Sequence, residues 1–154
     1  MTPTNKTFFD QYNEFANACE NPQGLVLQVP DPSFLDMCIR LVDEEWQEET
    51  KGWLAKYRLN PSLENFVEVA DGIVDTVYVL MQLARTLGIP FNECWDEVHQ
   101  SNMAKVVDGK VIRREDGKIL KPEGWKPPAL WDVCYAAYTK RMIEEGGGGL
   151  GDGE

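Results

Sequence analysis

The sequence is poor in histidine, and it lacks both a membrane-length hydrophobic run and a glycine-rich phosphate-binding loop. A single histidine, His99, is too few for a carboxylate-bridged iron bundle, which uses an ExxH motif on two helices. The glycines at 146–149 are not followed by the lysine that a P-loop requires. No apolar stretch is long enough to span a bilayer, and the polar start does not resemble a signal peptide. These absences favour a cytoplasmic protein that does not act at a membrane.

Positive charge and paired cysteines are also scarce. The chain has 15 Lys and Arg against 26 Asp and Glu, which gives a net charge of −11. This excess argues against binding to nucleic acid or to an anionic membrane. An anionic small ligand is still compatible, because metal ions or a local basic cluster can invert the field at one site. The four cysteines contain no CxxC pair, so we expect reduced thiols with neither a disulfide nor a zinc site.

The pattern of apolar residues predicts an all-α fold. A length of 154 residues suits one domain, which we expect over 1–145, followed by a flexible glycine-rich tail over 146–154. The turn pairs Asp108-Gly109 and Asp116-Gly117 predict a basic loop or small hairpin. Around it we expect a bundle of four to five helices. The predicted helices cover 7–20, about 33–57, 61–87, about 90–105 and 129–145.

The helix predicted over 61–87 has an unusual middle. Between Ile73 and Leu83 it is apolar on nearly all sides except for one acidic stripe. Such a helix is normally buried by more than the other helices of its own chain. We therefore expect the protein to be an oligomer.

Two acidic stretches on consecutive predicted helices are the most informative feature. Their acids are Glu44, Glu45, Glu48, Glu64, Glu68, Asp71 and Asp75. At α-helical spacing the first three share one face, and the last four fall within about 60° of arc. Facing carboxylates repel one another unless a cation lies between them, and hard oxygen ligands favour Mg²⁺ or Mn²⁺. The sequence therefore predicts a metal-dependent site.

The two stretches differ in how much they indicate. An acidic run such as 44–49 is, taken alone, most often a solvated helix face. Asp71 and Asp75 lie in an apolar helix, where a charge is costly unless it is paired or bound to metal. These two aspartates are therefore the stronger candidates for metal ligands.

Three motifs resemble those of the MazG-like nucleotide pyrophosphohydrolases. They are Glu44-Glu45-x-x-Glu48, the segment DGIVDTVYVL at 71–80 and the segment EVHQSNMAK at 97–105. The closing segment DGKILKPEGWKP at 116–127 resembles the branch described as phosphoribosyl-ATP pyrophosphohydrolase-like, which includes dUTP- and dNTP-cleaving enzymes. The similarity covers roughly residues 34–130. It implies an all-α homodimer or dimer of dimers that hydrolyses a nucleoside triphosphate to monophosphate and pyrophosphate.

One position departs from the family pattern. The second motif is usually ExxD, and its final acid is Asp75 here, but Gly72 occupies the position three before it. In one alignment Asp71 replaces the missing glutamate, with Glu68 behind it. In the other, Glu68 and Asp71 themselves form the ExxD, one turn back. Both alignments keep Asp71 in the site.

The implied chemistry assigns roles to the acids. Two or more Mg²⁺ ions, for which Mn²⁺ could substitute, would be held by Glu45, Glu48, Asp71 and Asp75. One ion would deliver a water of lowered pKa for attack at the α-phosphorus. Glu44 or Glu48 would accept the proton of that water.

The expected substrate-binding residues follow the acidic motifs in the sequence. The lysines would bind the β- and γ-phosphates, Asn102 would hydrogen-bond the substrate, and Trp125 or Trp46 would stack on the base. Each lysine could equally be an ordinary loop residue, and Trp125 could instead anchor an irregular segment to the core. The full set is Asn102, Lys105, Lys118, Lys121, Trp125 and Lys126.

The substrate is less constrained than the reaction. Compact members of the family include dUTP hydrolases and the phage-encoded MazZ type, which acts on (d)GTP. The length and the closing motif are compatible with a phage member, which slightly favours (d)GTP over dUTP and leaves phosphoribosyl-ATP as a weaker alternative. A phage origin would place the protein in the host cytoplasm. An alternative from another class is a non-enzymatic helical dimerisation module whose acidic stripe binds a basic partner.

Overall fold

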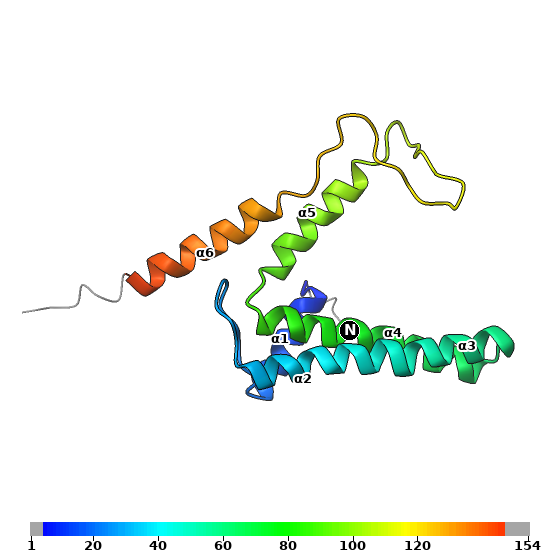
Figure 1. Cartoon of the computed structure of the whole chain (residues 1–154), viewed down its shortest axis with the longest axis horizontal. Coiled ribbons are helices and arrows are strands. Elements are labelled where there is room, and N and C mark those ends of the chain that lie inside the picture. The colour runs from blue at the N-terminus through cyan, green and yellow to red at the C-terminus, as the bar shows by residue number, and fades with distance from the viewer. Residues whose placement is uncertain (1–4, 147–154) are drawn as a thin grey trace, which may run out of the picture. The chain divides into compact units, whose positions relative to one another are not determined.

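The computed structural model describes residues 5–146, which are helical apart from their connections. The helices are α1 (Phe8–Ala18), α2 (Pro32–Asp43), η1 (Glu44–Thr50), α3 (Lys51–Leu59), α4 (Leu63–Thr86), α5 (Phe91–Met103) and α6 (Leu130–Gly146) (Figure 1). The segments α2, η1 and α3 follow one another without a break and form one long rod. The described residues contain no strand, so the predicted all-α fold is confirmed. Apart from Gly146, which ends α6, the predicted tail lies outside the described residues.

The chain divides into two compact units between Ile89 and Pro90. The first unit contains α1 to α4 together with η1, and the second contains α5, α6 and the loop that joins them. None of the described helices is both long enough and apolar enough to cross a membrane. The expectation of one domain over 1–145 stays a prediction.

Side-chain caps begin the helices of the first unit. Thr7 and Asp10 form a reciprocal capping box at the start of α1, in which each side chain accepts a hydrogen bond from the backbone N–H of the other. At the start of α4, the Ser62 hydroxyl accepts from the Asn65 N–H at 3.2 Å. These caps fix where each helix begins and therefore which faces meet.

The core of the first unit lies where α1 crosses the C-terminal part of α4. Tyr12 and Ala16 of α1 pack against Met81 of α4, and all three are buried. Buried Arg85 of α4 donates to the side-chain oxygens of two asparagines of α1 and to the carbonyl of Asn21. This charged anchor and the apolar contacts hold α1 over the C-terminal part of α4. The rod packs along the length of α4, with Cys38 of α2 beside Thr86 and Thr50 of η1 beside Gly72.

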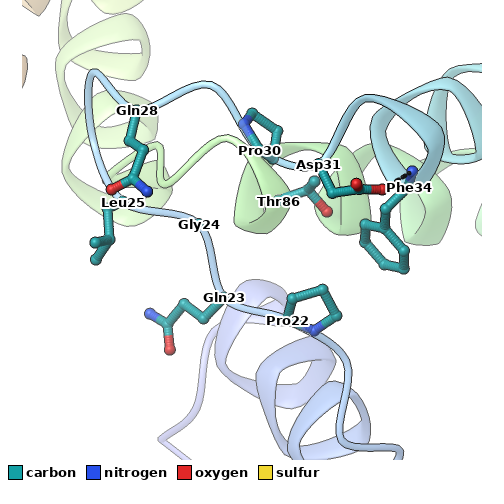
Figure 2. Close-up of a pocket in the computed structure, with 9 residues that line it drawn as sticks. All are labelled: Pro22, Gln23, Gly24, Leu25, Gln28, Pro30, Asp31, Phe34 and Thr86. Carbon is teal, nitrogen blue, oxygen red and sulfur yellow. Dashed lines mark hydrogen bonds between the residues drawn. The ribbon is translucent and has the colours of Figure 1, made fainter.

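The linker between α1 and α2 passes closely over the end of α4 (Figure 2). The Gly24 N–H donates to the Arg85 carbonyl at 3.0 Å, and a Cβ at Gly24 would lie 1.9 Å from the Thr86 carbonyl oxygen. Only glycine therefore permits this approach. A hollow of about 170 Å³ lies beside the contact. Its lining residues are Pro22, Gln23, Gly24, Leu25, Gln28, Pro30, Asp31, Phe34 and Thr86.

The one carboxylate that lines this hollow has a structural role. Asp31 is the N-cap of α2, where it accepts from the Phe34 N–H at 2.9 Å. Hydrogen bonds from the Ser33 hydroxyl and then from the Phe34 N–H lower the pKa of Asp31. Asp31 is the only acidic residue that lines the hollow, and it is already engaged in capping. The hollow therefore lacks the acidic cluster that the predicted chemistry needs.

The second unit carries the predicted basic loop or small hairpin. Between α5 and α6, isolated antiparallel bridges join Val107 to Lys110 and Arg113 to Ile119. The loop therefore turns back on itself without forming a regular strand, between α5 and the start of α6 at Leu130.

Candidate active site

The first acidic stretch folds as η1, a π-helical segment inserted between α2 and α3. In a π-helix each backbone N–H bonds to the carbonyl five residues back, and such turns are frequent at functional sites. The Thr50 hydroxyl spans the same interval, donating to the Glu45 carbonyl at 2.7 Å, and Thr50 is fully buried. The widened turn alters which glutamates face α4, relative to the α-helical spacing assumed from the sequence.

An acidic opening of about 260 Å³ lies between η1 and α4, which run side by side (Figure 1). Five of its seven lining residues are acidic and none is basic. The lining residues are Glu45, Glu49, Trp53, Glu68, Asp71, Gly72 and Asp75. We call this site the carboxylate opening. It contains three of the four predicted metal ligands, and it contains Glu68 as well, so both alignments of the second motif lead to the same place.

The other predicted acids lie elsewhere. Glu44 and Glu48 are exposed and do not line the opening. Glu48 was predicted to be a metal ligand, but Glu49, four residues after Glu45, lines the opening instead. The i, i+4 spacing of Glu45 and Glu49 is the signal that could have identified Glu49. The roles of Glu44 and Glu48 stay predictions.

Negative charge at the opening is not balanced by ion pairs. Burial first, and then the charges of Asp75, Glu49 and Asp71, raise the pKa of Glu45. In the part of the chain that the structure describes, none of the five carboxylates forms a salt bridge with lysine or arginine. A bound cation would therefore relieve the repulsion among these groups.

The ligand chemistry of the opening suits hard divalent cations. Carboxylate oxygens are the protein ligands that Mg²⁺ and Mn²⁺ prefer. Among the described residues, no three acidic, histidine or cysteine side chains already converge closely enough to hold an ion. The fit is therefore one of charge and ligand type, and binding would require the carboxylates to draw together.

Gly72 sits at a close contact between the rod and α4. A Cβ at this position would lie 2.7 Å from Thr50 Oγ1 and 3.2 Å from Thr50 Cα. The Thr76 hydroxyl lies 3.1 Å from that of Thr50 and donates to the Gly72 carbonyl at 2.7 Å. Position 72 is thus a buried helix contact, which explains why a glutamate is not accommodated there.

All six predicted substrate-binding residues lie in the second unit, and four of them gather in one cluster. Lys121 Nζ lies 4.3 Å, and Lys105 Nζ 5.6 Å, from the centroid of the Trp125 ring. Lys105 also donates to Asn102 Oδ1 at 2.8 Å. The Trp125 N–H donates to the Ser101 carbonyl at 2.8 Å, so the indole anchors the loop as well. We call Asn102, Lys105, Lys121 and Trp125 the Trp125 cluster.

The remaining two lysines contribute through their backbones. The Lys118 N–H donates to Asp116 at 3.1 Å, and the Lys126 carbonyl accepts from the Ser101 hydroxyl at 3.3 Å. Both residues are exposed. Their predicted contacts with substrate stay predictions.

Comparison with known families assigns the chain to a family. The family model for phosphoribosyl-ATP pyrophosphohydrolase matches residues 11–102, which is more than half of the sequence. The chain therefore belongs to this family, and the resemblance found in the sequence motifs is confirmed at family level. The matched region includes every residue of the carboxylate opening. A search of curated proteins found no match.

Family membership supports an enzyme that acts on pyrophosphate bonds of nucleotides. It favours this class over the non-enzymatic helical module. The match ends at Asn102, before the loop that carries most of the Trp125 cluster.

Proposed function

We propose that the protein is a Mg²⁺-dependent nucleoside triphosphate pyrophosphohydrolase with a preference for (d)GTP. The observation that carries the proposal is the carboxylate opening, where five acids from two packed helices face one space without a basic residue. Such a site attracts divalent cations, and divalent cations bind phosphates. The family match supports the same bond class.

The proposed reaction is hydrolysis at the α-phosphorus. The oxygen of a water molecule bonds to the α-phosphorus, the bond from that phosphorus to the bridging oxygen breaks, and pyrophosphate leaves. Bound Mg²⁺, or Mn²⁺ in its place, supplies charge neutralisation and a water of lowered pKa. Glu45, Asp71 and Asp75, with Glu49 and Glu68, would hold two or more ions at the opening.

In this proposal, protein side chains accept the proton and bind the phosphates. Glu44 or Glu48, on the exposed side of η1, would take the proton that the attacking water releases. The ammonium groups of Lys105 and Lys121, which lie over one indole ring, provide the positive charge that phosphate oxygens require. Lys118, Lys126 and Asn102 complete the proposed substrate-binding set.

The reaction is tested by product analysis. Purified protein with Mg²⁺ is incubated separately with each dNTP, GTP, dUTP and phosphoribosyl-ATP, and products are separated by ion-exchange chromatography. We expect equal amounts of monophosphate and pyrophosphate, with (d)GTP turned over fastest. Orthophosphate as the sole product would contradict attack at the α-phosphorus, and faster turnover of dUTP would reassign the substrate.

We also propose that the protein pairs with a second copy through α4. The N-terminal three-quarters of this helix exposes an apolar stripe, and Leu63 and Val74 remain 73% and 62% exposed. Extended apolar surface of this kind marks an interaction site. At helical spacing the stripe spans about 140° of arc and is separate from the acidic stripe. Its residues are Leu63, Phe66, Val67, Ile73, Val74, Val77 and Leu80.

A charge placed in this stripe is expected to separate the copies. Val74→Glu would put a carboxylate within the apolar contact, where its burial is unfavourable. Light scattering should give twice the chain mass for the wild type and one chain mass for the variant. Arg58→Glu, on the exposed surface of α3, is the charge-changing control and should remain dimeric. A wild-type protein with the mass of one chain would contradict the pairing.

A further inference from the structure

The helices of the second unit are held in a defined antiparallel register. Ser101 of α5 contacts both Trp125 and Lys126 through hydrogen bonds. Four residues earlier on α5, Glu97 Oε2 accepts from the Ala129 N–H at 3.1 Å. Residue numbers thus fall along α5 while they rise along the partner segment, and α6 begins beside the middle of α5.

Continuing this register by one turn brings two thiols together. Cys94 precedes Glu97 by three residues on α5, and Cys134 follows Ala129 by five residues on α6. Both thiols are only partly exposed. They lie close enough to influence each other's ionisation, and burial followed by the neighbouring Cys134 raises the pKa of Cys94 to about 11.

The other two cysteines are placed differently. Cys19 is exposed at the end of α1, and Cys38 is buried with its sulfur 3.5 Å from the Thr86 hydroxyl. Both lie in the first unit. Cys94 and Cys134 are therefore the pair that the fold of one unit juxtaposes.

We propose that Cys94 and Cys134 are a disulfide-forming pair that links α5 to α6 when the protein meets a low-molecular-weight disulfide such as oxidised glutathione. One protein thiolate attacks a glutathione sulfur, forming a mixed disulfide and releasing one glutathione thiolate. The second protein thiolate then attacks the protein sulfur of that mixed disulfide and releases the second glutathione. The protein loses two protons and two electrons, and the oxidised glutathione is reduced to two thiols.

The bond would fix the base of the hairpin that carries the Trp125 cluster. It closes the segment 94–134, which contains Asn102, Lys105, Lys121 and Trp125. Because the raised pKa keeps Cys94 mainly protonated at neutral pH, little of its reactive thiolate is present, and its reaction with the oxidant is slow. The spacing of cysteines in the sequence could not indicate this pair, since the two thiols meet only through the α5–α6 register.

The test uses the full chain treated with oxidised or with reduced glutathione. After alkylation of the remaining thiols and trypsin digestion without reductant, we expect a cross-linked species that joins peptides 86–105 and 119–140. Non-reducing electrophoresis should show that the link lies within one chain. Reduction should release both peptides.

Matched variants make the assignment specific. Cys94→Ser and Cys134→Ser should each abolish the cross-link, whereas Cys19→Ser should retain it, with circular dichroism confirming that all three remain helical. Alkylation of both thiols after oxidation, separate glutathione adducts on Cys94 and Cys134, or a link between two chains would overturn the proposal.

Discussion

Replacing Asp71 with asparagine is expected to lower kcat/KM for the preferred triphosphate by at least about 100-fold, because partners that only support a metal ligand already cost 10- to 100-fold when removed. Asp71 lines the carboxylate opening and belongs to the site in both alignments of the second motif. Asparagine keeps the shape of the aspartate side chain and removes the negative charge. Steady-state assays of pyrophosphate release measure the effect.

The same variant is expected to fold at least as well as the wild type. Asp71 contributes to the repulsion that raises the pKa of Glu45, so removing the charge of Asp71 reduces that repulsion in the folded state. A thermal unfolding midpoint equal to or above that of the wild type is expected in metal-free buffer. Asp36→Asn, an exposed acid of α2 away from the opening, is the matched control and should retain wild-type turnover. Wild-type kcat/KM in Asp71→Asn would remove Asp71 from the reaction.

Replacing Gly72 with valine is expected to destabilise the protein by about 1–3 kcal/mol, the range for overpacking a close contact. The added Cβ would lie 2.7 Å from the hydroxyl of buried Thr50 and 3.2 Å from its Cα. The gain of up to about 1 kcal/mol for removing glycine from a helix is too small to offset this clash. Denaturant unfolding followed by circular dichroism measures the difference.

Gly52 provides the matched control for Gly72. It also lies in a helix, but no atom outside the neighbouring backbone of that helix would come within 4 Å of an added Cβ. Gly52→Val should therefore change the free energy of unfolding by less than about 1 kcal/mol. Gly72→Glu, which restores the usual family spacing in one alignment, should be destabilised in the same way as Gly72→Val. Equal stability of the two valine variants would show that the contact with Thr50 is not tight.

The helical fold could be predicted because each helix has a strong local signal. The apolar period of 61–87 and the helix breakers around it correspond closely to α4. The helix over about 33–57 was predicted as one continuous α-helix, because no local signal in the sequence marks the switch from four- to five-residue hydrogen bonding in η1. The structure therefore divides that predicted helix into α2, η1 and α3.

The candidate site could be predicted in part for the same reason. Asp71 and Asp75 stood out as charges in an apolar helix, and the structure places both at the opening. Glu49 was not predicted because the family motif Glu44-Glu45-x-x-Glu48 points to Glu48, although Glu49 lies four residues after Glu45 and lines the opening with it. Gly72 was recognised as a departure, but its cause is a contact with Thr50 on another helix, which local patterns do not encode.

The central claim is that the carboxylate opening binds divalent cations, and calorimetric titration of the metal-free protein with Mn²⁺ tests it most directly. We predict saturable binding to the wild type and at least about tenfold weaker binding to Asp71→Asn. Because protons compete with metal for carboxylates and the pKa of Glu45 is raised, binding should weaken as pH falls, beginning at a higher pH than for an ordinary glutamate. A wild-type protein that takes up no Mn²⁺ or Mg²⁺ at neutral pH would contradict the account.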